Sequence, residues 1–389
     1  PPPFFFNDTA TTEIYTLSLR DALPIYRQIG ERGISAMSKI KVAIIGCGNI
    51  ANSAHLPAYQ AASDLCEVKY FCDLIEERAT ALRDKYGSGI VCVDYHDVVN
   101  DPEVTCVSIC TPNYEHAVIS IDMLNAKKNV LCEKPAAMNA DLAAQMQKAA
   151  DDNGVILNIG VCNRFNTSVN KIADLIQAGV LGNLYHVYCS FRAHRSIPGL
   201  GGAFTTKARS GGGALIDWGV HYLDLILYCL GDPAIKTVSA AAYSVLGKDI
   251  EGYVYESMWA GPPVKDGVYD VDDMVTGFVR TEGPTLSFNG AWAQNIGEGA
   301  TFIEFMGDKG GIKLQYGGGF VLYSTLNGML TETHFKYQTE NMYNAEVRDF
   351  LIKAPQGIKT KANIDKAIIT SRLMDMIYRS SELGEEVKA

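Results

Sequence analysis

Short apolar segments alternate with amphipathic ones along the first part of the chain. Continuous apolar runs at residues 41–45, 68–72, 104–110, 130–132 and 156–160 predict strands, with a shorter one at 91–93. Helical patterns lie between them, at 75–86, 116–126 and 139–153. Strands that alternate with helices of ten or more residues are typical of a parallel, doubly wound sheet. The pattern therefore predicts an N-terminal α/β domain.

The pattern changes after Arg164. A helix is expected at 168–178, a strand at 184–191 and a helix that opens at the glycine run 211–213. Extended runs then follow one another at 273–281, 285–292, 301–306, 311–315 and 320–324. Consecutive strands without helices between them indicate a mostly antiparallel sheet, which can carry helices on one face. We therefore predict a second, α+β domain with a large open sheet.

The expected domain limits are 37–162 for the first domain, 163–362 for the second and 363–389 for a C-terminal helix. Ile369, Leu373, Met376 and Ile377 form one apolar stripe of this helix, so it should pack back on the body.

We expect residues 1–36 to be an assembly artefact rather than part of the fold. Residues 7–25 read like the translation of a common sequencing adapter, with Arg20 as the one mismatch. We expect the natural chain to begin at Met37. Mass spectrometry of the native protein tests this, because a natural N-terminus before Met37 would contradict it.

Composition narrows the classes of partner. The net charge is −10 and no basic stripe is present, which argues against nucleic acid as a partner. No apolar run approaches the roughly 20 residues of a membrane span, so no membrane partner is expected. The ten cysteines are scattered and form no C-x-x-C, which favours reduced, buried thiols and a cytoplasmic location.

A glycine turn follows the first predicted strand. Gly46-x-Gly48-x-x-Ala51 leads into a helical segment, a context in which backbone amides can bind a pyrophosphate. Asp73 ends the second strand, where an acid would accept the adenosine ribose hydroxyls. An unrelated turn is the alternative for the glycines alone. Asp73 would repel a 2′-phosphate and so favours NAD over NADP, although Arg78 leaves NADP open.

The expected helix at 211–224 carries a possible proton-transfer pair. Asp217 and His221 are four residues apart, on one helical face, and Asp224 follows three residues later. A carboxylate beside an imidazole holds its tautomer and raises its basicity. The glycines ahead would let backbone approach a ligand. The alternative is a buried helix in which His221 and Asp217 satisfy each other.

Two polar tripeptides follow neighbouring strands. Thr111-Pro112-Asn113 comes after the fourth strand and Glu133-Lys134-Pro135 after the fifth. In open α/β sheets the ligand crevice lies outside those strand ends. A lysine beside a carboxylate there can stabilise a forming alkoxide. A plain surface turn is the alternative.

In this order and spacing, these motifs resemble the Gfo/Idh/MocA oxidoreductases, the glucose–fructose oxidoreductase and inositol dehydrogenase family. The resemblance runs from Ile40 to the C-terminus. It includes the glycine turn, Cys110-Thr111-Pro112-Asn113 with His116, the Glu133-Lys134-Pro135 motif, Asn163-Arg164-Phe165, the 211–224 block and Met376-Ile377-Tyr378-Arg379-Ser380.

The resemblance implies a Rossmann domain, a second domain whose open sheet forms a dimer or tetramer face, and a set of site residues. Lys134, Asp217 and His221 would be catalytic. Asp224 would be structural, and no metal site is expected because no further ligand cluster is present. The residues expected to bind NAD are Gly46, Gly48, Asn49, Ile50, Asp73, Thr111, Pro112, Asn113, His116, Glu133, Lys134 and Arg164.

The substrate side is expected to include Lys134, Asp217 and His221 together with Arg192, Arg195 and Trp218. Arg192 and Arg195 follow a strand and precede a Gly/Pro loop, where they could bind hydroxyls or an anionic group; a solvated loop is the alternative. Trp218 could stack on a sugar ring or pack in the core. The segment 194–207 resembles a branch that includes enzymes oxidising the 3-hydroxyl of glycosides.

The expected function is an NAD-dependent dehydrogenase of a ring hydroxyl in a sugar, glycoside or inositol. His221 or Lys134 would take the proton, and the sequence does not decide between them. Two alternatives stay open: a glycoside-cleaving enzyme that works through transient oxidation, and a non-catalytic NAD-binding regulator.

Overall fold

A six-stranded parallel sheet forms the first part of the described chain. The structure is a computed structural model that describes residues 39–389, so the expectations for residues 1–36 and for Met37 lie outside it. The strand order is β3-β2-β1-β4-β5-β6, as in a Rossmann sheet, and it reverses direction beside β1. The strands are β1 (Ile40–Ile45), β2 (Cys66–Cys72), β3 (Ile90–Cys92), β4 (Val104–Ile109), β5 (Asn129–Glu133) and β6 (Leu157–Gly160).

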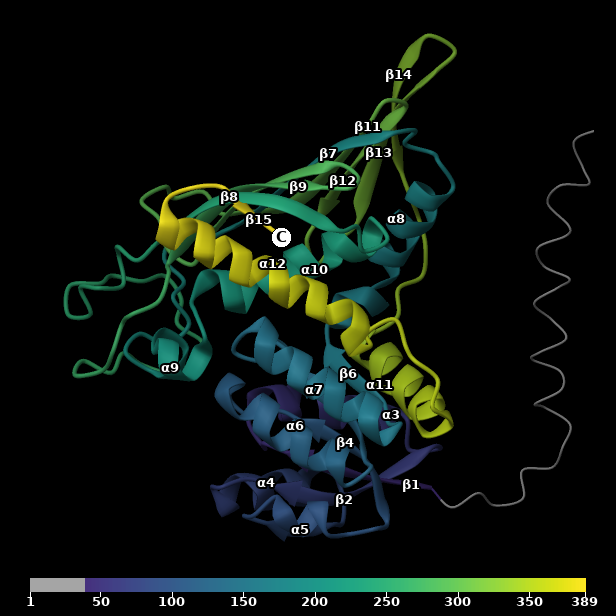
Figure 1. Cartoon of the computed structure of the whole chain (residues 1–389), viewed down its shortest axis with the longest axis vertical. Coiled ribbons are helices and arrows are strands. Elements are labelled where there is room, and N and C mark those ends of the chain that lie inside the picture. Colours follow the sequence, from purple (N-terminus) through teal and green to yellow (C-terminus); the bar gives the residue numbers. More distant parts are fainter. Residues whose placement is uncertain (1–38) are drawn as a thin grey trace, which may run out of the picture. The chain divides into compact units, whose positions relative to one another are not determined.

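Helices cover both faces of this sheet (Figure 1). In β1, Ala43 and Ile45 pack with one set of helices while Val42 and Ile44 pack with the other, because successive strand residues point to opposite faces. The first face is covered by α5 (His96–Val99), α6 (His116–Asn125) and α7 (Ala140–Asn153). The second is covered by α3 (Leu56–Ala61), α4 (Glu76–Tyr86) and α11 (Met342–Lys353).

A nine-stranded sheet forms the second part, in the order β14-β13-β12-β11-β7-β10-β9-β8-β15. Its neighbouring strands are antiparallel except for the parallel pair β7 and β10. The fold class predicted from the sequence is therefore confirmed. The strands are β7 (Leu184–Arg192), β8 (Ile235–Tyr243), β9 (Met274–Thr281), β10 (Thr285–Ala291), β11 (Ala300–Gly307), β12 (Gly310–Gln315), β13 (Phe320–Leu326), β14 (Met329–His334) and β15 (Val387–Lys388).

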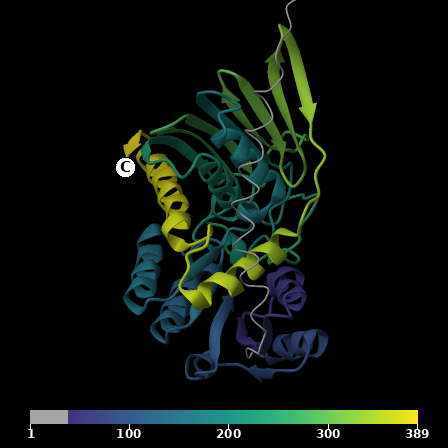
Figure 2. The same cartoon turned by 90° about the vertical axis from the view of Figure 1, so that its right-hand side faces the viewer.

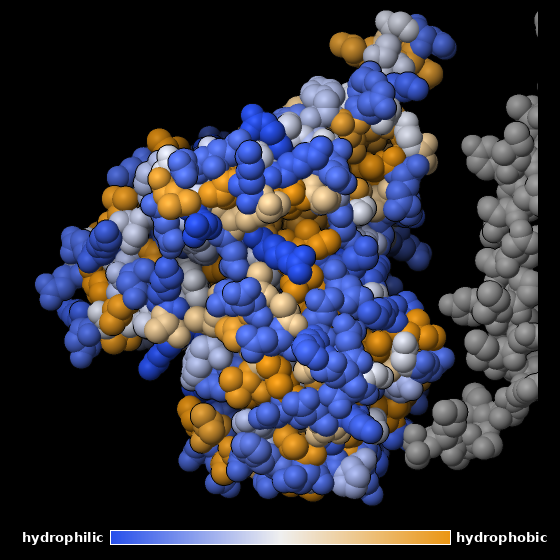
Figure 3. All heavy atoms as spheres, in the orientation of Figure 1, coloured by the Kyte–Doolittle hydropathy of each residue, from blue (hydrophilic) through white to orange (hydrophobic). Residues whose placement is uncertain are grey.

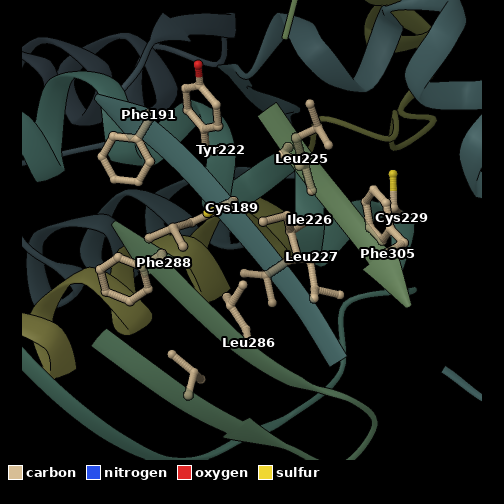
Figure 4. Packing of buried hydrophobic residues seen from close by; sticks show 14 of the residues in the cluster. Cys189, Phe191, Tyr222, Leu225, Ile226, Leu227, Cys229, Leu286, Phe288 and Phe305 are labelled. Atoms are coloured by element: carbon tan, nitrogen blue, oxygen red, sulfur yellow. The ribbon is translucent and has the colours of Figure 1, made fainter. Parts of the chain in front are cut away.

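One face of the nine-stranded sheet holds the main core. The helices α8 (Thr167–Gln177), α10 (Val220–Cys229) and α12 (Ile364–Leu383) pack on it. Figure 4 shows Leu225 and Ile226 of α10 over the strands that carry Cys189 and Phe288. The helix α12 contributes Leu373, Met374 and Ile377 to this core, and Figure 2 shows its course from the side.

The opposite face of this sheet is only partly covered. Tyr188 and Phe302 lie on it with ring centroids 5.7 Å apart, and His186 and Phe278 form a second ring pair at 6.5 Å. The β13–β14 hairpin extends past its neighbours and carries apolar atoms at its tip (Figures 1 and 3), where Leu330 is 92% exposed.

Two elements, α11 and β14, were not predicted from the sequence. The side chain of Asn341 nevertheless caps α11. All ten cysteines are free and buried, as predicted. Within residues 39–389, no helix is both long and apolar enough to cross a bilayer.

Candidate active site

The glycine turn after β1 opens onto a groove. Gly46 has a φ of 89°, and a Cβ there would lie 2.6 Å from the carbonyl of Cys110, so glycine is required where β1 and β4 diverge. A Cβ at Gly48 would meet nothing within 4 Å, so this glycine leaves space on the groove side. Asp73 fixes the turn, because its Oδ2 accepts a 2.8 Å hydrogen bond from the Cys47 amide.

We name this groove the strand-end groove, because its walls are the ends of β1, β2, β4 and β5. Its volume is about 790 Å³, within the range of ligand-binding clefts. Arg209, from the second part of the chain, also lines it and was not expected from the sequence. The residues predicted for cofactor binding that line it are Gly46, Gly48, Asn49, Ile50, Asp73, Thr111, Pro112, Asn113, Glu133 and Lys134.

Two residues predicted to bind the cofactor do not line the groove. His116 is buried, with Nδ1 2.8 Å from the Pro135 carbonyl oxygen and Nε2 2.9 Å from that of Thr111. It therefore packs between the two loops that form the crevice, and in its neutral form it can donate to one of these two carbonyl oxygens. Burial lowers the pKa of its imidazole. The prediction that His116 touches the cofactor is corrected to a role in positioning these loops.

Arg164 is the second correction. Its guanidinium is 1% exposed and makes two hydrogen bonds of 2.8 Å to the Asp224 carboxylate, as well as one of 3.0 Å to the Lys361 carbonyl. Thr370 also donates to Asp224. A buried guanidinium with these partners is not available to a cofactor. The pair instead links the segment after β6 to α10 and α12.

The segment that carries Asp217 and His221 is not a regular α-helix. Residues Leu215–Gly219 form a π-helical turn, which continues into α10. Its start is held by Asp272, whose carboxylate accepts hydrogen bonds of 2.8 Å from the Gly213 amide and 2.9 Å from the Leu215 amide. Tyr378 of α12 donates to the same carboxylate at 2.7 Å.

The glycines before this turn serve packing. A Cβ at Gly212 would collide with the Tyr378 hydroxyl, and one at Gly213 would collide with the Asp272 carbonyl oxygen. The expectation that they bring backbone close to a ligand is therefore replaced by close contact with α12 and the segment before β9.

Asp217 is bonded to Lys134 rather than to His221. Lys134 Nζ lies 3.0 Å from Asp217 Oδ1 and 3.2 Å from the Asp217 carbonyl oxygen. The other carboxylate oxygen is buried and has no hydrogen-bond partner among the described residues. No hydrogen bond therefore joins Asp217 to His221, although the Asp217 charge still acts on the imidazole, where it opposes the effect of burial on the pKa.

The two ionisable groups beside Asp217, His221 and Lys134, differ in charge at neutral pH. Burial, followed by the nearby Lys134 ammonium, lowers the pKa of His221 to about 3, so its imidazole is neutral. Burial opposes the charge of Lys134, but the carboxylates of Asp217 and Glu133 outweigh it and raise its pKa. The site thus pairs a neutral imidazole with a charged ammonium.

Glu133 is supported by a buried network that the sequence did not reveal. His55 Nε2 lies 2.8 Å from Glu133 Oε1, and its Nδ1 lies 3.1 Å from Ser108 Oγ, which contacts the Tyr59 hydroxyl at 2.7 Å. Burial opposes ionisation of Glu133, but His55 and Lys134 keep the pKa of this carboxyl below its usual value. Glu133 is therefore a fixed anion beside Lys134.

A second cavity, of about 430 Å³, lies against the same residues. We name it the tyrosine cavity, because Tyr222, Tyr316 and Tyr343 line it. His221 and Trp218, which the sequence placed among the expected substrate-binding residues, also line it. The two cavities share five lining residues, which we call the junction: Ile50, Glu133, Lys134, Asp217 and Trp259.

Arg192 and Arg195 line neither cavity. The Arg192 Nε is buried without a partner among the described residues. Arg195 donates a hydrogen bond to the Asn295 side chain and lies 5.5 Å over the Tyr253 ring. Arg195 is thus engaged outside the two cavities, whereas no described residue is a partner for the Arg192 Nε, and contact of either side chain with substrate stays a prediction.

Comparison with known proteins supports one assignment. The family model "Oxidoreductase family, NAD-binding Rossmann fold" matches residues 40–161, and the "GFO/IDH/MocA C-terminal domain" matches residues 169–313. The D-glucoside 3-dehydrogenase of Escherichia coli (strain K12) is 30% identical over 357 residues, which cover 90% of this chain and 98% of that protein. The chain belongs to the Gfo/Idh/MocA oxidoreductase family. The predicted family, NAD cofactor and oxidoreductase class are thereby confirmed.

Two other similar proteins extend the comparison. The inositol 2-dehydrogenase of Salmonella typhimurium (strain LT2) is 34% identical over 145 residues, which cover 37% of this chain and 43% of that protein. A solved structure of levoglucosan dehydrogenase, in complex with NADH and levoglucosan, superimposes with a TM-score of 0.77 at 20% identity. It covers 90% of this chain and 99% of the other, and it supports the fold.

Proposed function

We propose that this Gfo/Idh/MocA protein oxidises a ring hydroxyl of a sugar, glycoside or cyclitol with NAD as the acceptor. The observation that carries the proposal is the junction. A groove with the features of a dinucleotide site and a cavity with hydroxyl-bearing walls meet at Lys134 and Asp217. A cofactor in one and a substrate in the other would be in contact there.

The residues of the strand-end groove fit NAD. The space beside Gly48 can admit a pyrophosphate next to the backbone of the turn, and the Asp73 carboxylate lies in the same lining to accept ribose hydroxyls. Asp73 favours NAD over NADP, because it would repel a 2′-phosphate. When bound, NAD supplies the acceptor for the hydride that leaves the substrate carbon.

His221 is assigned the role of proton acceptor. The His221 imidazole lines the cavity and has a ring nitrogen that can take the hydroxyl proton, whereas the charged ammonium of Lys134 has no free site for it. Lys134 instead donates a hydrogen bond to the substrate oxygen and stabilises the negative charge that develops on it. Asp217 holds the ammonium in place and keeps it charged.

A glycoside is the first substrate to test, with the 3-hydroxyl as the position oxidised. The relative that spans nearly all of this chain is named for a D-glucoside 3-dehydrogenase activity. The levoglucosan and inositol enzymes act on other cyclic polyols by their names.

The experiment is a panel of glycosides, free sugars and inositols with NAD, followed by absorbance of NADH and by mass analysis of products. Formation of NADH with a keto-sugar product supports the proposal. If a glycoside is consumed without net NADH, the redox-neutral cleavage reaction takes its place. If no compound in the panel reacts or forms NADH, the dehydrogenase proposal fails.

We also propose a homo-oligomer in the cytoplasm. The partly covered face of the nine-stranded sheet, with Tyr188, Phe278 and Phe302, supports association through this sheet. The ten free cysteines support a reducing compartment. Light scattering tests the first point: a dimer or tetramer is expected, and a monomer at micromolar concentration would contradict it.

A further inference from the structure

Trp259 lies in a long irregular segment that nevertheless has its own core. This segment, 244–273, joins β8 to β9 and packs Tyr253 and Val271 against Ile197, Leu200 and Trp292. Its start is fixed by Asp273, whose Oδ2 accepts hydrogen bonds from three successive amides, those of residues 245–247. The segment is therefore ordered by its own packing and hydrogen bonds, and it can hold the Trp259 side chain in a defined place.

Trp259 is presented to both cavities. It is one of the junction residues and remains 54% exposed, which is high for an indole in a folded protein. Phe204 supports it edge-on, with ring centroids 4.9 Å apart and planes at 73°. Phe204 lies beside α9 (Lys207–Ser210), where the Lys207 amide bonds the Asp270 carboxylate of the same wall (α9 in Figure 1). The catalytic roles proposed above do not involve the Trp259 side chain.

The tyrosine cavity carries no surplus positive charge. Its ionisable lining comprises the carboxylates of Glu133 and Asp217, the ammonium of Lys134 and the neutral His221. Lys134 is already paired with Asp217, and the arginines of β7 and its following loop lie outside the lining. A phosphate or carboxylate placed here would have no free cation as a partner and would face Glu133.

We propose that Trp259 is the platform on which the substrate ring stacks, and that the site selects a neutral cyclic sugar or glycoside. This inference rests on the proposed dehydrogenase function. The axial C–H face of a pyranose or cyclitol is apolar and flat enough to cover an indole, whereas an open-chain polyol presents no such face. On the other walls, the Tyr316 hydroxyl accepts a hydrogen bond from Asn163 and can still donate one to the polar edge of the ring.

The test compares Trp259→Ala, Trp259→Phe and Tyr255→Ala. Tyr255 belongs to the same segment, is 45% exposed and lines neither cavity, so Tyr255→Ala is the matched control. With a methyl glycoside, Trp259→Ala should raise KM about tenfold, while Trp259→Phe and Tyr255→Ala stay within about threefold of wild type. With an open-chain hexitol, Trp259→Ala should raise KM by a smaller factor than with the glycoside, because no ring face is lost.

A binding readout separates this inference from the proposed function. Calorimetric titration of the NADH-loaded protein, which cannot oxidise the glycoside, should give similar Kd values for wild type, Tyr255→Ala and Trp259→Phe, and a Kd about tenfold higher for Trp259→Ala. If wild type forms NADH but Trp259→Ala keeps the wild-type KM, the platform is wrong and the dehydrogenase stands. If wild type forms no NADH with any ring substrate, the proposed function fails instead.

The preference for a neutral ring is tested separately, with anionic derivatives of the glycoside. The kcat/KM for a glycoside should exceed that for its 6-phosphate and for the matching uronide by at least about 100-fold, since each adds a buried anion without a cation. Equal or better turnover of either anionic compound would overturn the selection of a neutral ring.

Discussion

The strand-end groove and the tyrosine cavity meet at the junction but are built in different ways. The groove takes its lining from short continuous stretches, such as Gly46 to Ile50 and Thr111 to Asn113, each directly after a parallel strand. The cavity takes Tyr222, Thr301 and Tyr343 from three elements that are far apart in the sequence. A site made of strand ends leaves a local motif, whereas one made of distant side chains does not.

The largest effect is expected from a change that affects the tyrosine cavity but not the strand-end groove. His221 lines the cavity but not the groove. His221→Asn should lower kcat by about 10³- to 10⁴-fold, because the proton acceptor is lost, while the Kd for NAD stays within about twofold. Steady-state kinetics and calorimetry measure the two. Near wild-type turnover would remove His221 from the mechanism.

Lys134→Met affects the junction itself. It should also lower kcat by about 10²- to 10⁴-fold, since the cation that stabilises the substrate oxygen is lost and Asp217 is left without its partner. Lys134→Arg is the control, because it keeps the charge. A Lys134→Met enzyme with normal kcat and a changed pH profile alone would contradict this role.

Arg164 tests whether the structural correction holds. Arg164→Met should lower the free energy of unfolding by about 3–5 kcal/mol, because it leaves the buried Asp224 carboxylate without its ion pair. The double variant with Asp224→Leu should recover part of this loss. Urea denaturation measures both. A weaker affinity for NAD at unchanged stability would restore Arg164 as a cofactor ligand.

A substitution of Asp73 affects the strand-end groove but not the tyrosine cavity, and so complements His221→Asn. Asp73→Ala should raise the Kd for NAD about 10- to 100-fold with kcat at saturating NAD nearly unchanged, the reverse of His221→Asn. Asp73→Asn keeps an acceptor for the Cys47 amide and should lose less, while it relaxes discrimination against NADP. A drop in kcat with normal NAD affinity would contradict the assignment.

The smallest effect concerns pH. The pKa of His221 is lowered to about 3 in the folded protein, from an ordinary value near 6.5. The unfolded chain therefore binds a proton first as the pH falls, so the stability due to the neutral His221 is present above pH 6.5 and is lost progressively below it. Between pH 7 and pH 5, wild type should lose about 1 kcal/mol more stability than His221→Asn, after allowance for water in the cavity. Equal losses in urea midpoints would contradict the lowered pKa.

The fold and the groove were largely predictable. The alternation of strands and helices indicated the parallel sheet, and the turn residues indicated Gly48 and Asp73, both of which line the groove. β14 could also have been found, because Asn327 and Gly328 form a two-residue turn with positive φ, a known hairpin signal. The helix α11 has an Asn341 cap and an apolar stripe at Val347, Phe350 and Leu351 that indicate a helix.

The true partner of Asp217 was not predictable. A π turn has no sequence signature of its own, so the spacing of Asp217 and His221 suggested an α-helical pair. The turn depends on Asp272 and Tyr378, which reach it from more than fifty residues away. Trp259 gave no signal either, because it lies in an irregular segment without periodicity. These features come from tertiary packing, which local patterns do not record.

The contact between Lys134 and Asp217 spans the two halves of the fold, since one residue follows a strand of the parallel sheet and the other lies just before α10. Reactivity is therefore a property of how the halves are docked and not of either half by itself. A chain in which they are misaligned by a side chain's width could still hold its nucleotide, yet it would lack an oriented ammonium and would be chemically silent.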